Sequence, residues 1–226
     1  MRVFFAVFGT LSIIPGVHVS NTPATPLYPD QFTQNFTEIV YEAEGSYLTT
    51  GTYIYDWTNL KYSIERENGR HDIFCQAEYP NTDTPCSHII VGGNRFLSYP
   101  DMNDCCYCCD SSEGCGLLKP DWLSDATFQG TFFVHLNNGS YANTYKWKKD
   151  GNEANFYYET MESSPLNRTM VEIFQSPSEA ALYDIPRLLT VDSEKLSLPP
   201  ICSMNKTCSG VCALVRSNAT PLPLPF

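Results

Sequence analysis

Basic residues are scarce in this chain of 226 residues, with 14 Lys and Arg against 25 Asp and Glu. Proteins bind nucleic acid by neutralising phosphates with Lys and Arg, so this balance excludes nucleic acid as a partner. Long hydrophobic runs are also missing. After the N-terminus no stretch approaches the ~18 apolar residues of a membrane-spanning helix. The sequence therefore predicts no transmembrane segment.

Histidine and the common catalytic motifs are equally sparse. Once a leader is removed, the remaining histidines are His71, His88 and His135, each in a segment that reads as a strand. The sequence contains no Gly-x-Ser-x-Gly elbow, no phosphate-binding loop and no pair of carboxylates that stands out as a glycosidase pair. We therefore expect a protein that is not an enzyme and has no catalytic residues.

The N-terminus reads as a secretory leader. Arg2 precedes a short apolar run, residues 3–14, which predicts a signal peptide over residues 1–20 with cleavage between 16 and 24. Its removal leaves 13 basic and 25 acidic side chains, a net charge of about −12 (13 − 25). We expect a secreted chain with one β domain over residues 28–202. A Cys-containing, Pro-rich tail over residues 203–226 follows it and lacks the hydrophobic run of a lipid-anchor signal.

Half of the ten cysteines lie within residues 105–115. Neighbouring cysteines bridge each other only through a strained ring, so the four clustered sulfurs of residues 105–109 are expected to reach partners elsewhere. An even count behind a leader predicts five disulfides. Two interleaved Cys-x-x-Cys pairs leave structural zinc as the alternative, which an oxidising compartment disfavours. The expected disulfide residues are Cys75, Cys86, Cys105, Cys106, Cys108, Cys109, Cys115, Cys202, Cys208 and Cys212.

Asn-x-Ser/Thr sequons agree with passage through the secretory pathway. The fifth sequon, at Asn218, has Pro221 directly after it and is left out. The expected glycosylation sites are Asn35, Asn138, Asn167 and Asn205.

Alternation of apolar and polar residues predicts β-strands through most of the chain. In the first strand, residues 37–43, we expect the side that carries Glu38, Val40 and Glu42 to face water. Asn68-Gly69 and Gly92-Gly93-Asn94 predict hairpin turns. Short helices are expected over residues 120–126 and from the Ser176 capping box to Pro186. The expected strands are residues 37–43, 52–57, 60–66, 70–77, 88–91, 95–99, 128–136, 141–149, 154–160 and 169–175.

Large aromatic residues recur at every second position of several of these strands. Such rings are usually core, but a sheet that curves without a second sheet to cover it leaves a concave apolar surface that can hold a ligand. Both alternatives stay open. The candidate ligand-binding residues are Tyr53, Tyr55, Trp57, Phe132, Val134, Phe156 and Tyr158.

Four pieces of the sequence carry a family resemblance. They are Tyr55-Asp56-Trp57, the cysteine region ahead of Pro120, the hairpin that includes Tyr157-Tyr158-Glu159-Thr160, and Leu198-Pro199-Pro200-Ile201-Cys202. In this order, over residues 28–202, the chain resembles the ependymin-related secreted glycoproteins. The resemblance implies a half-open sheet like that of a bacterial lipoprotein carrier, a hydrophobic ligand, and association with calcium and extracellular matrix. It also implies that Cys202 reaches back to the cysteine cluster.

The expected fold is mainly β: a single curved antiparallel sheet or half-open barrel with one or two short helices and a disulfide knot. The expected function is binding of a lipid-like or other hydrophobic ligand by a secreted glycoprotein. The alternative is a structural or cell-surface interaction module without a small ligand. No cofactor is expected other than the calcium that the resemblance implies, and a homodimer stays open.

Overall fold

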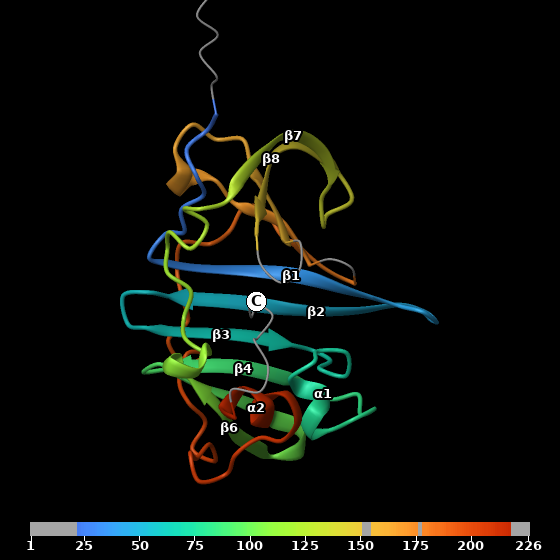
Figure 1. Ribbon diagram of the computed structural model, residues 1–226, viewed down its shortest axis with the longest axis vertical. Helices are drawn as coiled ribbons and strands as arrows, with labels where there is room; N and C mark the ends of the chain where they lie inside the picture. Colours follow the sequence, from blue (N-terminus) through green and yellow to red (C-terminus); the bar gives the residue numbers. More distant parts are fainter. Residues whose placement is uncertain (1–21, 151–154, 176–177, 218–226) are drawn as a thin grey trace, which may run out of the picture.

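The computed structural model describes residues 22–150, 155–175 and 178–217 (Figure 1). The predicted signal peptide, most of the turn at 150–152, the sequon at Asn218 and the last part of the Pro-rich tail lie outside the described residues.

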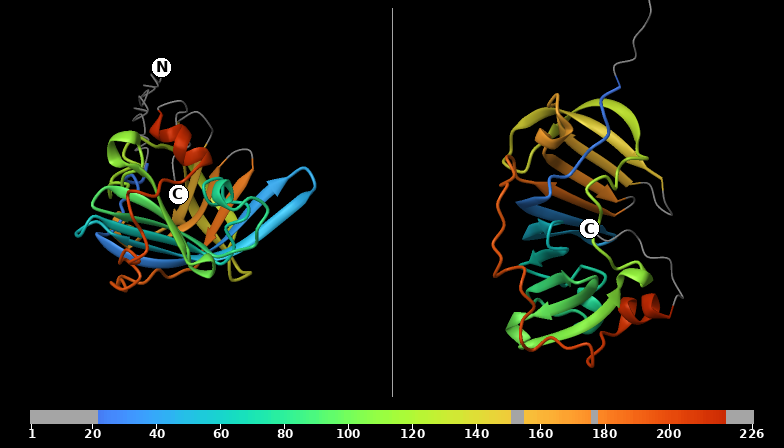
Figure 2. Two further views of the ribbon diagram at one scale, coloured as in Figure 1. Left: turned by 90° about the horizontal axis from the view of Figure 1, so that it is seen from below. Right: turned by 90° about the vertical axis from the view of Figure 1, so that its left-hand side faces the viewer.

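The described residues form one antiparallel sheet of eleven strands that does not close into a barrel. This confirms the expected fold class. The sheet bends into a trough, with the short helices α1 (Cys75–Glu78) and α2 (Gly210–Arg216) on the side of its opening (Figure 2). The strands are β1 (Gln31–Glu42), β2 (Gly45–Asp56), β3 (Lys61–Arg66), β4 (Cys86–Val91), β5 (Asn94–Tyr99), β6 (Asp104–Asp110), β7 (Thr127–His135), β8 (Tyr141–Lys149), β9 (Asn155–Thr160), β10 (Met170–Gln175) and β11 (Glu179–Tyr183).

Two meanders make up the sheet, and they meet at β1. The strand order is β6-β5-β4-β3-β2-β1-β11-β10-β9-β8-β7, so the first six strands run outward from β1 on one side and the last five on the other. The chain after β11 then runs along the convex side of the trough toward β6 (Figure 2). As a result, β6 and β7 are the two edges of the sheet.

The core lies on the concave face. On β1 the side chains of Phe32, Gln34, Phe36 and Glu38 alternate with more exposed neighbours and are buried. The expectation that Glu38 faces water is therefore wrong. Its carboxylate accepts two hydrogen bonds from the Arg66 guanidinium, at 2.6 and 2.9 Å, and this pairing compensates the burial of both charges.

Three expected elements take other forms. Residues 70–77 do not make a strand, because the Asp72 carboxylate accepts the backbone N–H groups of Phe74 and Cys75 and turns the chain into α1. His71 consequently lies in a turn. Residues 120–126 form turns instead of a helix. The helix expected up to Pro186 is replaced by β11, which pairs with both β1 and β10.

The cysteine cluster is itself the edge strand β6, which is not among the strands expected from the sequence. Strand alternation sends Cys105 to the convex side, where it bonds Cys202, and sends Cys106 to the concave side, where it bonds Cys208. Cys108 bonds Cys212 on α2. The knot therefore ties the C-terminal segment to β6.

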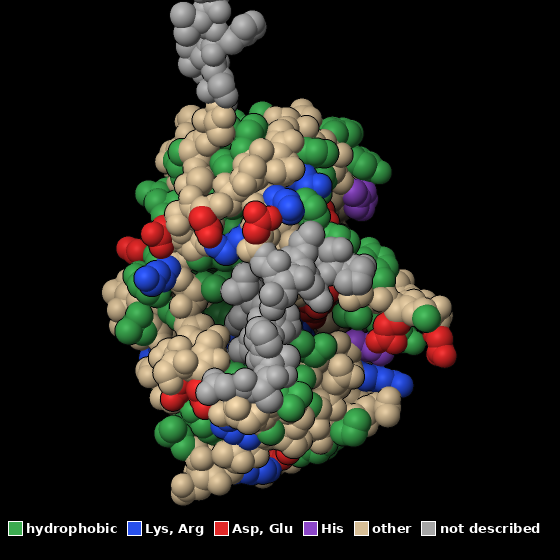
Figure 3. Space-filling model, in the orientation of Figure 1, with side chains coloured by type: hydrophobic (Ala, Val, Ile, Leu, Met, Phe, Trp, Pro, Cys, Tyr) green, Lys and Arg blue, Asp and Glu red, His purple; other side chains and the backbone are tan. Residues whose placement is uncertain are grey.

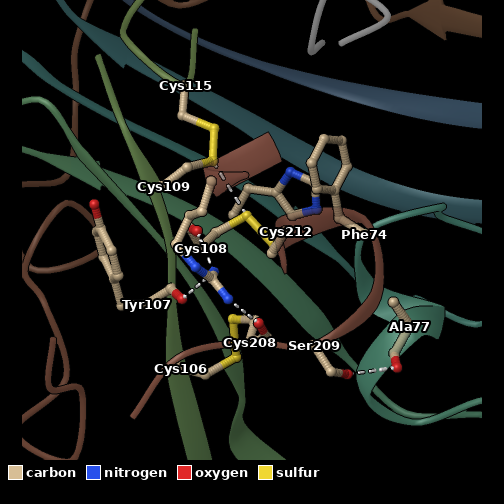
Figure 4. Close-up of a disulfide and its surroundings, with 12 residues drawn as sticks. Phe74, Ala77, Cys106, Tyr107, Cys108, Cys109, Cys115, Cys208, Ser209 and Cys212 are labelled. Atoms are coloured by element: carbon tan, nitrogen blue, oxygen red, sulfur yellow. Dashed lines mark hydrogen bonds between the residues drawn. A yellow bond between two sulfur atoms is a disulfide. The ribbon is translucent and has the colours of Figure 1, made fainter. Parts of the chain in front are cut away.

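The remaining two disulfides are local. Cys109 bonds Cys115, and Cys75 bonds Cys86 instead of reaching the cluster. Figure 4 shows three of the bridges together with the hydrogen bond by which Ser209 Oγ donates to the Ala77 carbonyl and joins the α2 segment to α1. Five disulfides were expected from ten cysteines, and this is confirmed. The convergence of Cys202 on the cluster agrees with what the resemblance implied.

The two sheet edges differ. Along β6 the backbone N–H of Tyr107 donates to the Lys206 carbonyl, and the N–H of Cys208 donates to the Tyr107 carbonyl. The C-terminal segment thus covers this edge. On β7 the side chains of Phe132 and Phe133 are exposed.

Candidate ligand site in the hollow of the sheet

Aromatic rings fill the middle of the trough. Tyr53 and Tyr55 alternate along β2 and point to the concave face, where both are buried. The ring of Phe32 on β1 lies 5.3 Å from that of Tyr53 and 5.1 Å from that of Tyr55, and Tyr62 on β3 lies 5.6 Å from Tyr53. Neighbouring strands therefore present one continuous aromatic surface.

Two loop segments cross this surface and cover it. Tyr28, in the segment before β1, donates its backbone N–H to the Pro120 carbonyl at 2.9 Å and packs its ring between Tyr55 and Trp122. The Tyr55 hydroxyl donates to the Leu118 carbonyl at 2.8 Å. We name residues 116–126 the strap. No second sheet covers the concave face among the described residues, and the strap takes that place (Figure 1).

The candidate ligand residues separate onto two faces. Tyr53 and Tyr55 are concave, and Trp57, directly after β2, packs half-buried against the same core cluster. Phe156 and Tyr158 point to the convex side of β9, since their neighbours Tyr157 and Glu159 are the buried ones. Alternation along β7 places Val134 on the same face as Phe132.

The aromatic residues Phe132, Phe156 and Tyr158, the convex group, surround the amino group of one lysine. Lys146 Nζ lies 4.1 Å from the centre of the Phe156 ring, 4.8 Å from that of Phe132 and 5.1 Å from that of Tyr158. A cation over aromatic faces is a favourable arrangement in itself. These rings therefore have a partner within the chain and are not part of the trough.

Several trough residues were missed in the sequence. Trp147 on β8 and Tyr157 on β9 face each other across the strands and are buried, and Trp122 on the strap packs edge-on against Tyr157 at 4.7 Å. The sequence does carry a signal for Trp147 and Tyr157, because they fall on the same face of the two strands of a predicted hairpin. Tyr28 and Trp122 lie in loops, where no periodicity marks them.

The largest hollow described is about 690 Å³ and lies on the polar convex side of β1, β2 and β3, where Asn35, Thr52 and Glu65 line it. Two smaller cavities open on the concave side of the described residues. The larger, of about 280 Å³, lies at the outer end of the β1–β2 hairpin and is lined by Glu38, Val40, Tyr47, Leu48, Thr49, Asn68, Arg70, His71, Asp72 and Asp83. The smaller, of about 10 Å³, lies beneath the strap and is lined by Tyr53, Tyr62, Ile90, Arg95, Gly116, Leu117 and Leu118. The aromatic middle of the trough is thus almost completely packed, and the open space is at one end.

A buried ionic network forms the floor between the two cavities. Arg66 pairs with Glu38 and also lies 3.4 Å from an Asp72 oxygen, and His88 Nε2 lies 3.0 Å from the other oxygen of Asp72. Burial alone would raise the pKa of Asp72, but Arg66 and His88 hold it far below its ordinary value. Burial lowers the pKa of His88, which keeps this imidazole neutral near pH 7.

A third acid, Glu179 on β11, joins the network. Burial, together with the neighbouring Glu38, raises the pKa of Glu179 to about 8, so Glu179 is protonated at neutral pH. Its proton allows it to hydrogen-bond with Glu38. The network therefore places the Asp72 carboxylate, and Glu38 in its pair with Arg66, beside the buried guanidinium groups of Arg66 and Arg95.

Two groups of residues have the spacing of metal ligands: Cys75, Cys86 and His88, and Cys108, Cys109 and Cys115. All of these cysteines are in disulfides. They cannot supply the thiolates that zinc requires, so the oxidised chain offers no zinc site in either group.

The face seen in Figure 3 and the helices of the described residues give no further candidate. Acidic and basic side chains are interspersed on the face seen in Figure 3, between patches of apolar residues. No helix in the described part of the chain has both the length and the apolar composition needed to cross a bilayer.

Comparison with known proteins gives no assignment. No protein-family model matches the chain, and a search of curated proteins finds no match.

Proposed function

We propose that this protein is a secreted glycoprotein that binds a lipid-like or other hydrophobic ligand in the hollow of its curved sheet. The observation that carries the proposal is an unclosed eleven-stranded sheet whose aromatic concave face is covered by loops. A loop such as the strap can be displaced at lower cost than a second sheet, because it gives up few backbone hydrogen bonds.

The ligand enters at the hairpin end of the trough. There Val40, Tyr47 and Leu48 supply an apolar wall to the cavity of about 280 Å³, and Arg70 and His71 supply polar groups. This volume is close to the lower limit of small-molecule sites, which begin at about 300 Å³. A longer ligand extends toward the middle of the trough, where it displaces the half-buried Leu117 and Leu118 of the strap.

Surface features support the extracellular part of the proposal. The four expected sequon residues Asn35, Asn138, Asn167 and Asn205 are all exposed, as glycosylation requires. Five disulfides are typical of an oxidising compartment. Association with calcium, extracellular matrix or a second copy of the chain rests on the resemblance to ependymin-related proteins.

Lipid extraction of the purified protein followed by mass spectrometry tests the proposal, together with titration of a neutral fluorescent probe, N-phenyl-1-naphthylamine. Val40→Trp fills the cavity and should abolish probe binding. Leu189→Trp adds the same ring at an exposed position away from the trough and serves as the matched control. A parent protein that carries no lipid and binds no probe would contradict the proposal.

The second candidate is a disulfide-stiffened structural or cell-surface interaction module. It is favoured by the close packing of Tyr53 and Tyr55, which leaves only about 10 Å³ beneath the strap. In that case the rings contribute to stability alone. A folded protein without bound lipid, whose melting temperature does not change with any hydrophobic probe, is the result that this candidate requires.

A further inference from the structure

Arg95 on β5 is an unusual residue in the trough because its charge is buried and none of the described residues forms an ion pair with it. The residue is fully buried, and its guanidinium lies between two rings, 6.0 Å from the centre of Tyr62 and 5.6 Å from that of Phe74. Its Nε and Nη1 atoms have no hydrogen-bond partner among the described residues. Leaving a buried charged donor unsatisfied is costly, so such a group calls for a functional explanation.

A second unsatisfied donor meets Arg95 at the same place. The Tyr62 hydroxyl also has no hydrogen-bond partner in the described part of the chain. Both residues line the cavity of about 10 Å³ beneath Leu117 and Leu118. Burial raises the pKa of Tyr62, which keeps its hydroxyl protonated and able to donate. Two kinds of hydrogen-bond donor therefore converge on one small apolar-walled space.

The nearby carboxylates are already occupied. Asp72 pairs with Arg66 and His88, and Glu38 pairs with Arg66. Burial lowers the pKa of Arg95, which shows that its surroundings disfavour the positive charge. An anion placed between Arg95 and Tyr62 would accept hydrogen bonds from the free N–H and O–H groups and compensate the buried positive charge.

We propose that Arg95 and Tyr62 form a buried anion-binding site that takes the carboxylate of a fatty-acid-type ligand. The inference rests on the proposed function and narrows the ligand class from hydrophobic molecules in general to amphiphilic monocarboxylic acids. With the strap in place, the space of about 10 Å³ is no larger than a single water molecule needs. A carboxylate enters when Leu117 and Leu118 move aside and the first carbons of the acyl chain take their place.

Competition between oleic acid and oleyl alcohol, which have the same chain and differ in the head group, tests the inference. Each displaces N-phenyl-1-naphthylamine from the purified protein at pH 7. We expect the parent to bind the acid at least about tenfold more tightly than the alcohol, the effect of one charge-assisted hydrogen-bonded pair. Arg95→Met should bring the two affinities together by weakening acid binding at least about tenfold.

Two further variants complete the design. Tyr62→Phe removes only a hydroxyl and should reduce the acid preference in part, so it keeps the test valid even if Arg95→Met does not fold. Lys148→Met removes a positive charge from a partly exposed position and should leave the preference unchanged. Loss of the preference in Lys148→Met as well would assign it to general surface charge and overturn the site.

The competition experiment distinguishes failure of the carboxylate site from failure of the proposed function. A parent that binds acid and alcohol equally keeps the function and overturns the carboxylate site. A parent that binds neither contradicts both. If sodium chloride alone raises the melting temperature of the parent, but not of Arg95→Met, while acid and alcohol compete equally, the site belongs to a free inorganic anion and the carboxylate assignment is overturned.

Discussion

At the scale of single residues, Glu38 and Arg66 form a buried ion pair at the floor of the trough. Removing one partner of a buried ion pair leaves an uncompensated charge, which costs about 3–5 kcal/mol. Glu38→Ala is therefore expected to lower the free energy of unfolding, measured in urea, by about that amount. The matched control is Glu65→Ala, which breaks the more exposed pair of Glu65 with Lys195 and should cost no more than about 1 kcal/mol. Equal losses in the two variants would contradict the assigned role of Glu38.

Two aromatic residues from opposite faces of the sheet should respond differently to truncation. Tyr53→Ala removes a buried ring that contacts Phe32 and Tyr62, so it is expected to lower the free energy of unfolding by about 3–5 kcal/mol. Phe156→Ala acts on the half-exposed convex group and is expected to cost clearly less, and to leave probe binding in the trough unchanged. Thermal melting and probe titration of both variants check this expectation. Weakened probe binding in Phe156→Ala would place the ligand on the convex face instead.

The separation of these rings shows what periodicity can and cannot predict. Alternation identified Phe156 and Tyr158 as one face of a strand, but the sequence does not tell which face is concave. That choice is made by tertiary packing, in which Tyr157 packs its ring against Trp122 and Trp147 lies opposite Tyr157 on the neighbouring strand. The same limit explains Glu38, because its partner Arg66 is brought beside it only through the pairing of β1, β2 and β3.

At the scale of elements, turn chemistry was a good guide where strands flank it on both sides. Gly92 and Gly93 both adopt positive φ, 58° and 80°, and make the β4–β5 hairpin that Gly-Gly-Asn predicts. The hairpin that Asn68-Gly69 predicts does not form, because the Asp72 carboxylate accepts backbone N–H groups of the residues that follow and begins α1. The helix expected up to Pro186 does not form, because β11 pairs with the neighbouring β10 and also with β1, and the pairing with β1 is long-range and has no local signal.

The three bridges between β6 and the C-terminal segment should be strongly non-additive. The first bridge closes a loop of about 100 residues, worth about 4.7 kcal/mol in the chain-entropy estimate, and each further bridge then closes a loop of only about nine residues, worth about 2.5 kcal/mol. Cys106→Ser with Cys208→Ser should therefore cost about 2.5 kcal/mol. Removal of all three bridges should cost several times more. Urea unfolding of the two variants measures both losses, and a single-bridge loss near 5 kcal/mol would contradict this redundancy.

At the scale of the whole molecule, buried acids predict how stability changes with pH. The pKa of Glu179 is raised to about 8 by burial and Glu38, and that of Glu159 to about 7 by burial, against the ordinary value of 4.5. Between about pH 4.5 and 8 the folded chain therefore binds more protons than the unfolded chain, and stability falls as pH rises. The melting temperature should be higher at pH 5.5 than at pH 8. Below about pH 4 the trend reverses, since Asp72 has a lowered pKa and its protonation removes stability.

Glu179→Gln should flatten this dependence, because the amide cannot ionise between pH 5.5 and 8. Glu194→Gln, at an exposed position, is the matched control and should keep the slope of the parent. Identical slopes in both variants would show that Glu179 does not carry the pH dependence.

β1 lies where the two meanders meet, and this position affects how the chain folds during its synthesis on the ribosome. β1 is the first strand to emerge, and its pairing with β2 can form at once, but its other edge waits for β11. Similarly, Cys105, Cys106 and Cys108 emerge long before Cys202, Cys208 and Cys212. In the secretory compartment that we propose for this protein, closely spaced thiols on one strand are exposed to oxidation during that interval without their native partners. The nascent chain is therefore expected to depend on a disulfide isomerase, and chains cut short before residue 202 should accumulate as mixed disulfides.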